Sequence, residues 1–336
     1  MKVLVTGGGG FLGQAVCRQL KARGYAVRSF NRQRHAALDA LGVEQLAGDL
    51  RSLEMVIEAA AGCDAIVHTA AKAGAWGPLA EYYEINVRGT DHVLAACEYH
   101  GIDRLVHTSS PSVVHSGADL NGVNESVPYA THFLAPYPQT KALAEQRVLA
   151  ANSPRLATVA LRPHLIWGPG DPHLLPRLLA RARAGRLRHL GEVSKKIDTV
   201  YVDNAAEAHA LALEKLAPGA AIAGKAYFIT NGEPAPQDAV INGLLKAAGL
   251  PPETRRLPLG LARFLGTVLE WLYRLPGVHA EPPLTRFLVE QLSTAHWFSI
   301  AAARRDLGYA PRVSTPEGLA RLSEHLARER LRQRGG

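Results

Sequence analysis

The sequence is poor in cysteine, and its few cysteines stand far apart. Cys17, Cys63 and Cys97 are the only three in 336 residues, and their spacing matches neither a zinc site nor a redox pair. The 14 histidines form no ligand cluster either, so we expect no bound metal. Because the chain opens with a strand-like MKVLVTG, we also expect no signal peptide and a reducing, cytoplasmic setting.

Long apolar runs and concentrated charge are also missing. In the most apolar helical stretch the longest charge-free run, Phe264–Leu269, is far shorter than the roughly 20 residues that a membrane span needs. The net charge is +8, but the excess comes from arginines scattered along helical stretches rather than from a basic run interleaved with aromatics. We therefore expect no transmembrane segment and no nucleic-acid partner.

What the sequence does contain is a regular alternation of short apolar runs and helical patterns over its first half. Strands are predicted at Lys2–Val5, Ala26–Phe30, Glu44–Leu46, Ala65–His68, Arg104–His107 and Ala157–Leu161. Helices are predicted between them at Leu12–Arg23, Leu53–Ala61, Glu81–His100 and Tyr137–Ala151. This order is typical of a doubly wound, Rossmann-type α/β fold with a parallel sheet.

The texture changes after Pro163, where prolines and glycines become frequent. Residues 1–163 are predicted to form the Rossmann-type domain, and residues 164–330 a smaller, mostly helical lobe. Some later elements are expected to return to the main domain. They are helices at Leu174–Ala184 and Asn204–Leu216 and strands at Asp198–Val202 and Lys225–Thr230.

Residues 261–275 form a pattern of their own, which predicts an amphipathic helix. Seven apolar residues recur at helical spacing and four polar ones take the opposite face: Leu261, Phe264, Leu265, Val268, Leu269, Leu272 and Leu275 against Arg263, Thr267, Glu270 and Arg274. Four roles stay open. The helix could pack in the core of the lobe, cover an apolar substrate, contact a partner, or touch a membrane surface with Trp271 and Tyr273 at the boundary.

A glycine-rich segment joins the first predicted strand to the first predicted helix. Gly7, Gly10 and Gly13 are spaced as G-x-x-G-x-x-G, which suits a tight turn, a close approach of a pyrophosphate and packing of the helix on the strand. The N-terminus of the helix would face the phosphates with its free N–H groups. Inside a βαβ unit, this pattern predicts a dinucleotide site.

The end of the second strand indicates which dinucleotide binds. An acidic residue there would hydrogen-bond the adenosine ribose and repel a 2′-phosphate, but the chain has Asn31 and Arg32, with Arg34 nearby. This favours NADP(H). Asp49, after the third strand, is predicted to contact the adenine amino group, and it could also cap the helix that starts at Leu53.

Tyr137 and Lys141 lie four positions apart at the start of a predicted helix, so both face the same side. A neighbouring ammonium favours the phenolate, which is expected to bring the pKa of Tyr137 closer to neutral and to make it a general acid/base. Upstream, a strand ends in Thr108, Ser109 and Ser110, one of which could polarise a substrate carbonyl. Beside a dinucleotide site, these residues predict an oxidoreductase.

With these motifs the sequence resembles the extended short-chain dehydrogenase/reductase superfamily, in its 3β-hydroxysteroid dehydrogenase-like branch, from Thr6 to Pro311. The resemblance implies that Ser110 is the catalytic serine and Tyr137 the general acid/base. It implies that Lys141 binds the nicotinamide ribose and tunes Tyr137. Asn86 matches the asparagine that supports the active site in that family.

The same resemblance completes the predicted NADP(H) site, because His68–Ala71 matches the fourth-strand segment that lines the cofactor and Leu161–Pro163 matches the segment after the sixth strand. The predicted cofactor residues are Gly7, Gly10, Phe11, Leu12, Gly13, Asn31, Arg32, Asp49, Leu50, Thr69, Ala70, Ala71, Tyr137, Lys141 and Pro163. Residues 1–163 would then be the NADP(H)-binding domain with the catalytic residues, and residues 164–330 would bind the substrate.

Three further segments, 72–77, 165–171 and 281–287, resemble reductases of the bacterial long-chain olefin (head-to-head hydrocarbon) pathway. That resemblance implies NADPH-dependent reduction of a 2-alkyl-3-oxoalkanoate, a β-keto acid with long alkyl chains. It further implies assembly with the β-lactone synthetase and β-lactone decarboxylase of that pathway. A homodimer is also expected, because the helices at 81–100 and 137–151 form a dimer interface in the superfamily.

Two other kinds of function stay open. The chain could be a hydroxysteroid or sterol dehydrogenase or an NAD-dependent sugar-nucleotide epimerase, although Gly191–Lys196 replaces the Gly-Asp-Gly that is common in sugar-nucleotide enzymes. It could also be a non-catalytic NADP(H)-binding scaffold. The intact set of Ser110, Tyr137 and Lys141 argues against a scaffold.

Overall fold

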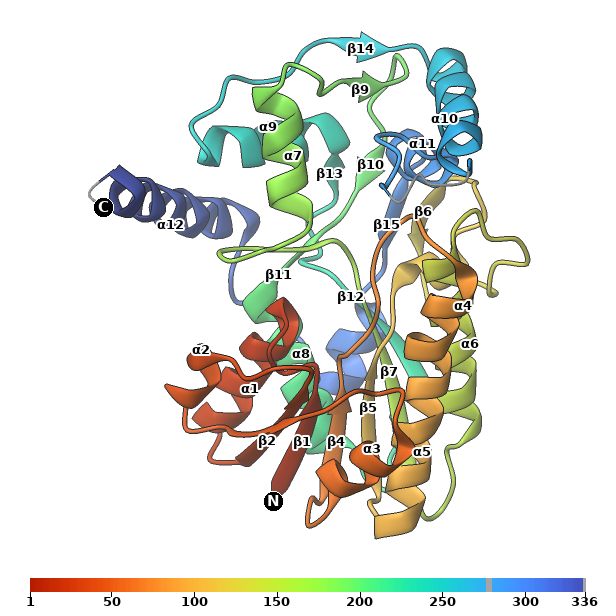
Figure 1. Ribbon diagram of the computed structural model, residues 1–336, viewed down its shortest axis with the longest axis vertical. Helices are drawn as coiled ribbons and strands as arrows, with labels where there is room; N and C mark the ends of the chain where they lie inside the picture. The colour runs from red at the N-terminus through yellow and green to blue at the C-terminus, as the bar shows by residue number, and fades with distance from the viewer. Residues whose placement is uncertain (276–279, 335–336) are drawn as a thin grey trace.

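The computed structural model describes residues 1–275 and 280–334, and its largest element is a parallel sheet of seven strands (Figure 1). The strand order is β12-β7-β5-β4-β1-β2-β3, and each neighbouring pair is parallel. The strands are β1 Lys2–Thr6, β2 Ala26–Asn31, β3 Glu44–Ala47, β4 Ala65–His68, β5 Arg104–Thr108, β7 Ala157–Pro163 and β12 Lys225–Ile229. The predicted strands of the first half are all present, and the doubly wound fold class is confirmed.

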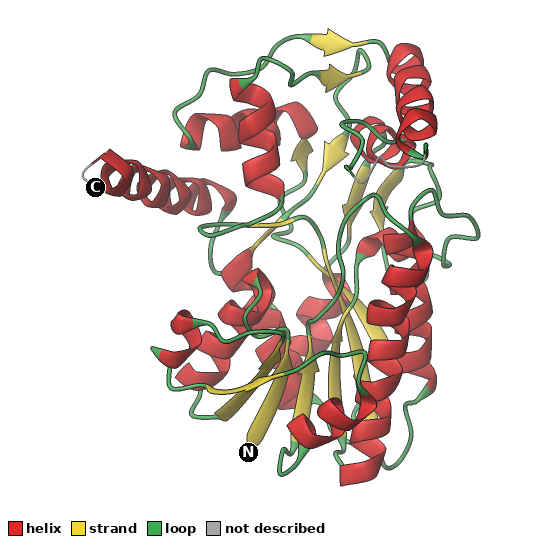
Figure 2. Ribbon diagram, viewed as in Figure 1, coloured by secondary structure: helices red, strands yellow, loops and turns green. Residues whose placement is uncertain are grey.

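Helices cover both faces of this sheet (Figure 2). The helices on one face are α1 Phe11–Ala22 and α8 Val202–Lys215, and those on the other are α3 Leu53–Ala60, α5 Gly89–His100 and α6 Pro136–Ala150. In β1, Val3 and Val5 belong to the core beneath α1 and α8, whereas Leu4 belongs to the opposite core. The strands are therefore apolar on both faces, as buried parallel strands are.

The carboxyl ends of these strands lie at one edge of the sheet, which faces the second lobe (Figure 1). β1 lies between β4 and β2, so the chain winds outward through β2 and β3 and then crosses back to β4. Ligands of doubly wound sheets bind at such a switch point, outside the carboxyl ends of the strands. The residues that follow β1, β4, β5 and β7 are thereby brought to one place.

The second lobe combines short strands with helices, and α12 projects to one side of it (Figure 1). One small sheet has the order β13-β10-β15-β6, with β6 Leu120–Val123, β10 Lys196–Ile197, β13 Ala235–Pro236 and β15 His296–Phe298. The helices are α7 Leu174–Arg183, α9 Gln237–Ala247, α10 Leu259–Tyr273, α11 Arg286–Ser293 and α12 Thr315–Arg334. β12 and α8 return from this half of the chain to the main sheet.

The remaining elements are short, and the structure corrects the predicted bounds of one helix and one strand. They are α2 Ala36–Asp39, α4 Leu79–Tyr82, the π-helical η1 Tyr83–Arg88, η2 Pro111–Val114, β8 Ile166–Trp167, β9 His189–Leu190, β11 Val200–Tyr201, β14 Arg256–Leu257 and η3 Ala303–Leu307. The helix predicted over 81–100 is α4, η1 and α5 in succession. The strand predicted over Asp198–Val202 is too long, because α8 already begins at Val202.

Helix α10 does not pack through the apolar side that its amphipathic pattern predicts. Ala262, Gly266 and Glu270 are its buried residues, although the pattern placed Glu270 on the solvent side. A Cβ on Gly266 would lie 3.4 Å from the backbone nitrogen of Arg286, and the Glu270 carboxylate accepts hydrogen bonds from that nitrogen and from the Arg286 side chain. Much of the apolar stripe is left exposed, at Leu261, Phe264, Val268, Trp271, Leu272 and Leu275.

The close approach of α11 explains this orientation, because only small side chains and a paired carboxylate fit between the two helices. Packing of the apolar stripe into the core of the lobe is therefore wrong. Its other three roles stay predictions. In residues 1–275 and 280–334, no helix combines the length and apolar character needed to cross a membrane.

A buried ion pair joins α6 to β7. The Arg162 guanidinium donates from Nε to Oε2 of Glu145 at 3.0 Å and from Nη2 to Oε1 at 2.5 Å. The Tyr129 hydroxyl donates to the same carboxylate at 2.6 Å, and the guanidinium lies 5.1 Å from the centre of the Phe228 ring. The Arg162 and Glu145 side chains are 4% and 0% exposed, so the attraction between the two charges is what mainly offsets the cost of burying each of them.

We expect Glu145→Gln to lower the free energy of unfolding by about 3–5 kcal/mol, because Arg162 would remain as a buried charge without its partner. The matched control is Glu317→Gln, which breaks the exposed Arg321–Glu317 pair and should cost less than about 1 kcal/mol. Urea unfolding followed by circular dichroism measures both values. Equal losses in the two variants would contradict a structural role for the buried pair.

Candidate active site

The loop between β1 and α1 is packed so closely that side chains would not fit at two of its glycines. Gly7 has a φ of +70°, and a Cβ there would lie 2.7 Å from the Cα of Ala70. A Cβ on Gly13 would lie 2.1 Å from the Gly7 carbonyl oxygen. Glycine at these two positions therefore lets the loop pack against Ala70, which follows β4, and against the first turn of α1.

The N-terminus of α1 opens toward this edge of the sheet. Gly10 is its exposed N-cap residue, and the Gly10 N–H donates to the Gly7 carbonyl at 2.9 Å. Phe11 and Leu12 form the first turn, and no acidic side chain lies in that turn. Backbone N–H groups and the helix dipole at such an end attract phosphate.

Asn31 ties the glycine loop to the end of β2. Its Oδ1 accepts a hydrogen bond from the Gly9 N–H at 2.8 Å. The next residue, Arg32, is exposed and forms no ion pair in the described part of the chain. Arg34, by contrast, is paired with Asp39 at 2.9 Å. The end of β2 thus carries Arg32, whose charge helps to lower the pKa of the nearby Asp49, and no carboxylate of its own.

Asp49 does not cap the helix that follows it, and that alternative is wrong. Ser52 stands directly before α3, and its hydroxyl accepts a hydrogen bond from the Met55 N–H at 3.3 Å. The Asp49 carboxylate instead accepts hydrogen bonds from the Arg51 side chain and N–H, and this pairing lowers the pKa of Asp49. Leu50, between them, is buried.

The loop after β4, Thr69–Ala71, is fixed at both ends by hydrogen bonds. The Thr69 hydroxyl donates to the last carbonyl of β1 at 2.7 Å. Asn86 accepts from the Lys72 N–H at 2.7 Å and donates to the Lys72 carbonyl and the Thr140 hydroxyl, both at 3.0 Å. Asn86, which lies in the π-helical η1, thereby joins this loop to helix α6. Such π turns are frequent at functional sites.

Ser110 and Tyr137 meet beyond the carboxyl end of β5. The Ser110 hydroxyl accepts a hydrogen bond from the Ser112 N–H at 3.2 Å, and it lies close enough to the Tyr137 phenol to lower the pKa of that group. Burial raises the pKa of Tyr137, and the Ser110 hydroxyl offsets this rise only in part. The predicted lowering of this pKa toward neutral is therefore wrong, because burial outweighs the effect of the Ser110 hydroxyl and the Lys141 ammonium is bound by β5 instead.

Lys141 is buried and directs its charge toward β5 rather than toward the phenol. Its Nζ donates to the Thr108 carbonyl at 2.5 Å and lies 3.3 Å from Nε2 of His107. Burial lowers the pKa of Lys141 to about 8, and the charge of Glu145 opposes that shift. Tyr137 and Lys141 both belong to α6 as predicted, but the strand holds the ammonium.

The sequence did not predict that several histidines are buried together around Lys141, although His68 belongs to a segment that was expected to line the cofactor. The His68 ring lies 5.2 Å from the ring of His107, and Nε2 of His209 lies 2.8 Å from the Thr108 hydroxyl. Burial lowers the pKa of His68 to about 3 and that of His209 to about 4, so both are neutral. The available signal was a histidine near the end of each of two apolar strand runs, His68 and His107. A buried polar side chain needs hydrogen-bond partners, so such histidines indicate a buried polar cluster.

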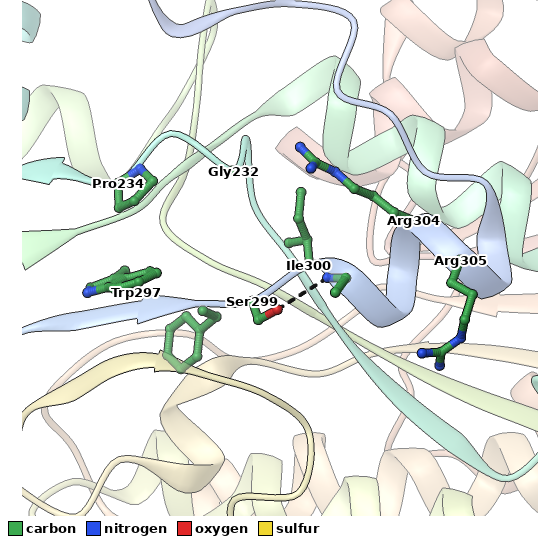
Figure 3. A pocket seen from close by; sticks show the side chains of 9 residues that line it. Gly232, Pro234, Trp297, Ser299, Ile300, Arg304 and Arg305 are labelled. Carbon is green, nitrogen blue, oxygen red and sulfur yellow. Dashed lines mark hydrogen bonds between the residues drawn. The ribbon is translucent and has the colours of Figure 1, made fainter.

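The predicted residues that follow β1, β4, β5 and β7 lie at one edge of the sheet, and none of them lines the pocket in Figure 3. Pro163 ends β7, which pairs with β5, and the Ser109 N–H donates to the Leu161 carbonyl at 2.6 Å. The pocket in Figure 3 measures about 560 Å³ and is lined by Gly232, Pro234, Trp297, Phe298, Ser299, Ile300, Ala301, Arg304 and Arg305, none of which was predicted. Among the described residues no group of three or more His, Cys, Asp or Glu is placed to hold a metal ion.

Comparison with known proteins gives the family of the chain. Residues 4–259 match the 3-beta hydroxysteroid dehydrogenase/isomerase family. A 2-alkyl-3-oxoalkanoate reductase of Stenotrophomonas maltophilia is 57% identical over 97% of this chain and 100% of its own length. A protein of the same name from Shewanella oneidensis is 49% identical over 96% of this chain and 85% of its own length.

A solved structure shows the same fold. MoeE5, in complex with UDP-glucose and NAD, aligns with a TM-score of 0.75 at 24% identity, covering 98% of this chain and 99% of that one. The sequence match and the shared fold agree with the motifs at the edge of the sheet. The chain belongs to the 3-beta hydroxysteroid dehydrogenase/isomerase family.

Proposed function

We propose that this protein is an oxidoreductase that uses a nicotinamide dinucleotide to reduce the 3-keto group of 2-alkyl-3-oxoalkanoates. The observation that carries the proposal is the convergence of Ser110, Tyr137 and Lys141 at the sheet edge that also carries the Gly7–Gly13 loop. The two reductases that are 57% and 49% identical support the substrate class. The NAD bound by the similarly folded MoeE5 supports the cofactor class.

The residues at the sheet edge fit such a cofactor. A Cβ on Gly7 or Gly13 would collide with backbone, so the loop keeps its N–H groups close to the edge. Two buried polar groups there, Nδ1 of His107 and the Ser109 hydroxyl, have no hydrogen-bond partner among the described residues. We infer that the glycine loop binds the pyrophosphate and that Lys141 binds the nicotinamide ribose. A reduced nicotinamide, when bound, would supply a hydride to the keto carbon.

Tyr137 would deliver the proton that accompanies the hydride. Its raised pKa keeps the phenol protonated at neutral pH, which suits a general acid that donates to the keto oxygen. Ser110 would hydrogen-bond the same oxygen as negative charge develops on it. Lys141 would stabilise the phenolate that remains after proton transfer. The substrate would thereby become a 2-alkyl-3-hydroxyalkanoate.

The cofactor is proposed to be NADP(H) rather than NAD(H). Arg32 is exposed and forms no ion pair within the described residues, and its charge helps to lower the pKa of the nearby Asp49. Asn31 is engaged with the glycine loop, so the end of β2 offers a 2′-phosphate a cation and no carboxylate of its own. An arginine can bind a phosphate with two parallel hydrogen bonds.

Three finer parts of the function stay predictions: the olefin pathway, assembly with its β-lactone synthetase and β-lactone decarboxylase, and the homodimer. The exposed apolar stripe of α10 is the candidate contact surface for the assembly or for a membrane surface. Intact activity and assembly after removal of residues 261–275 would eliminate that surface.

Absorbance of NADPH separates the proposed function from its rivals. Purified protein with NADP⁺ and a racemic 2-alkyl-3-hydroxyalkanoic acid is expected to form NADPH, whereas a 3β-hydroxysteroid and UDP-glucose should give none. A response to the hydroxysteroid alone would move the substrate class to steroids. Conversion of UDP-glucose without net NADPH would identify an epimerase, and silence with every substrate would contradict an oxidoreductase.

We expect Tyr137→Phe to lower kcat by about 10²- to 10⁴-fold, because the phenol is the proposed proton donor. The dissociation constant for NADPH should stay within about twofold of the wild-type value, since the phenyl ring keeps the shape of the site. Tyr99→Phe is the control, because Tyr99 is 72% exposed. Steady-state kinetics and fluorescence titration measure the two effects, and full turnover in Tyr137→Phe would exclude the proposed acid.

We expect Arg32→Ala to weaken NADPH binding by about 10- to 100-fold and to leave NADH binding unchanged, because a charge-assisted hydrogen bond to the 2′-phosphate would be lost. Arg34→Ala is the matched control, since Arg34 is already paired with Asp39. Fluorescence titration with both nucleotides measures the effect. An equal loss for NADPH and NADH would contradict the assignment of Arg32 to the 2′-phosphate.

We expect the wild type to gain stability relative to Lys141→Met as the pH rises from about 8 to about 10. At neutral pH both the folded and the unfolded chain carry the charged Lys141, so folding buries an ammonium. Above the folded pKa of about 8 the folded state has lost that proton, whereas the unfolded state keeps it up to about 10.5. Because the unfolded state then binds more protons, stability rises with pH.

The gain should reach up to about 3 kcal/mol, as expected for a pKa shift of this size. Denaturant unfolding of the cofactor-free protein at several pH values measures it. Lys246→Met, at an exposed position, serves as the control and should show no such trend. If the free energies of unfolding of the wild type and Lys141→Met differed by the same amount across this pH range, the lowered pKa of Lys141 would be refuted.

A further inference from the structure

A second set of buried histidines lies where the chain leaves β7. His164 directly follows Pro163, and its Nδ1 lies 2.6 Å from Oδ1 of Asp198. Its Nε2 lies 3.1 Å from Nδ1 of His296, whose Nε2 lies 2.7 Å from the Gln291 carbonyl oxygen. The three side chains are buried. This chain of contacts links the end of β7 to the β10–β11 connection, to β15 and to α11.

Counting protons shows that this chain carries a positive charge on one imidazole. The Asp198 carboxylate and the Gln291 carbonyl only accept hydrogen bonds, so the three contacts need three protons, whereas two neutral imidazoles carry two. Burial lowers the pKa of His296 to about 3, so the extra proton is not on that ring. An imidazole also binds a proton more tightly than a carboxylate does in water. The third proton therefore belongs to His164.

The groups around this chain favour the same assignment. The second oxygen of Asp198 accepts a hydrogen bond from the Phe298 N–H at 2.8 Å, which favours the ionised carboxylate. Besides His164, two titratable groups act on His296 from neighbouring elements: His115, whose ring centre lies 5.9 Å from that of His296, and Asp119, which is paired with Lys195. Glu290 lies 3.2 Å from the His115 ring. Asp198 is thus the carboxylate left to balance the imidazolium.

The residue after His164 has a strained backbone. Within residues 1–275 and 280–334, Leu165 is the one residue other than glycine with a positive φ, at +42°. Side chains disfavour this conformation, and it persists only where the surrounding structure enforces it. Leu165 turns the chain out of β7 and into β8, which pairs with β11. The His164 side chain fixes one side of this turn and the β8–β11 pairing fixes the other.

We propose that His164 is a positioning residue: held as an imidazolium between Asp198 and His296, it keeps Leu165 in its left-handed conformation and so fixes Pro163 beside the nicotinamide half of the cofactor. The location of the nicotinamide rests on the proposed function. The protonated chain and the strained turn are properties of the protein without cofactor, so they can be tested separately.

The first test is binding, with variants that separate the charge from the backbone. His164→Gln keeps a polar side chain that cannot carry the extra proton, and it should weaken NADPH binding by about tenfold. Binding of 2′-phospho-ADP-ribose, which lacks the nicotinamide, should not change. Adding Leu165→Gly should restore NADPH binding, because glycine adopts a positive φ without help. Adding Leu165→Ala should not, because alanine loses the side chain but keeps the Cβ.

His189→Gln is the matched control, because the His189 side chain is also buried but makes one hydrogen bond among the described residues, to the Glu253 carbonyl. It should change neither binding constant. Wild-type NADPH affinity in His164→Gln, or rescue by alanine as complete as rescue by glycine, would overturn the proposal. If His164 had only a structural role, His164→Gln would weaken the binding of NADPH and of 2′-phospho-ADP-ribose alike, and Leu165→Gly would not restore NADPH binding better than Leu165→Ala.

The second test uses the protein without cofactor. Nitrogen NMR at neutral pH should show both ring nitrogens of His164 protonated, and a pyridine-type nitrogen on that ring would overturn the proposal. If the wild type bound neither NADPH nor 2′-phospho-ADP-ribose, the proposed function would fail. The positioning role would still be supported if Leu165→Gly, and not Leu165→Ala, restored the unfolding midpoint lost in His164→Gln.

Discussion

One stripe of helix α6 faces the edge of the sheet, and its position depends on the ion pair between Glu145 and Arg162. Tyr137, Lys141 and Glu145 follow one another at intervals of four residues, so they share one side of the helix. Glu145 binds β7 through Arg162, and Lys141 binds the last carbonyl of β5. Because these strand ends lie at one edge, a single helix register sets the relative positions of the phenol, the ammonium and the cofactor loop.

Burial then sets the charges at this edge. It raises the pKa of Tyr137, lowers that of Lys141 to about 8 and keeps the nearby His68 neutral, with a pKa of about 3. The phenol therefore keeps its proton at neutral pH, and Lys141 is bound by the end of β5. This distribution suits donation of a proton to a keto oxygen, the direction that the two similar reductases are named for.

Much of the fold and the outline of the site follow from local sequence patterns, whereas contacts across long separations do not. The G-x-x-G-x-x-G spacing and the four-residue interval from Tyr137 to Lys141 predicted the loop and the helix that carry them. An amphipathic pattern gives α10 a polar and an apolar side but not the side that packs, which close contact at Gly266 decides. His164, Asp198 and His296 come from distant segments, so no spacing could predict their chain. Nor can spacing predict burial, which reversed the expected pKa shift of Tyr137.

Transfer of deuterium from NADPH labelled at C4 of the nicotinamide tests most directly whether this edge of the sheet reduces a keto acid. With a 2-alkyl-3-oxoalkanoate, mass spectrometry should find one deuterium in the product, bound to C3, and NADP⁺ in equal amount. That result requires hydride transfer to the keto carbon in a site that binds both molecules. A 2-alkyl-3-hydroxyalkanoate without deuterium, or unchanged keto acid, would contradict the proposed reaction.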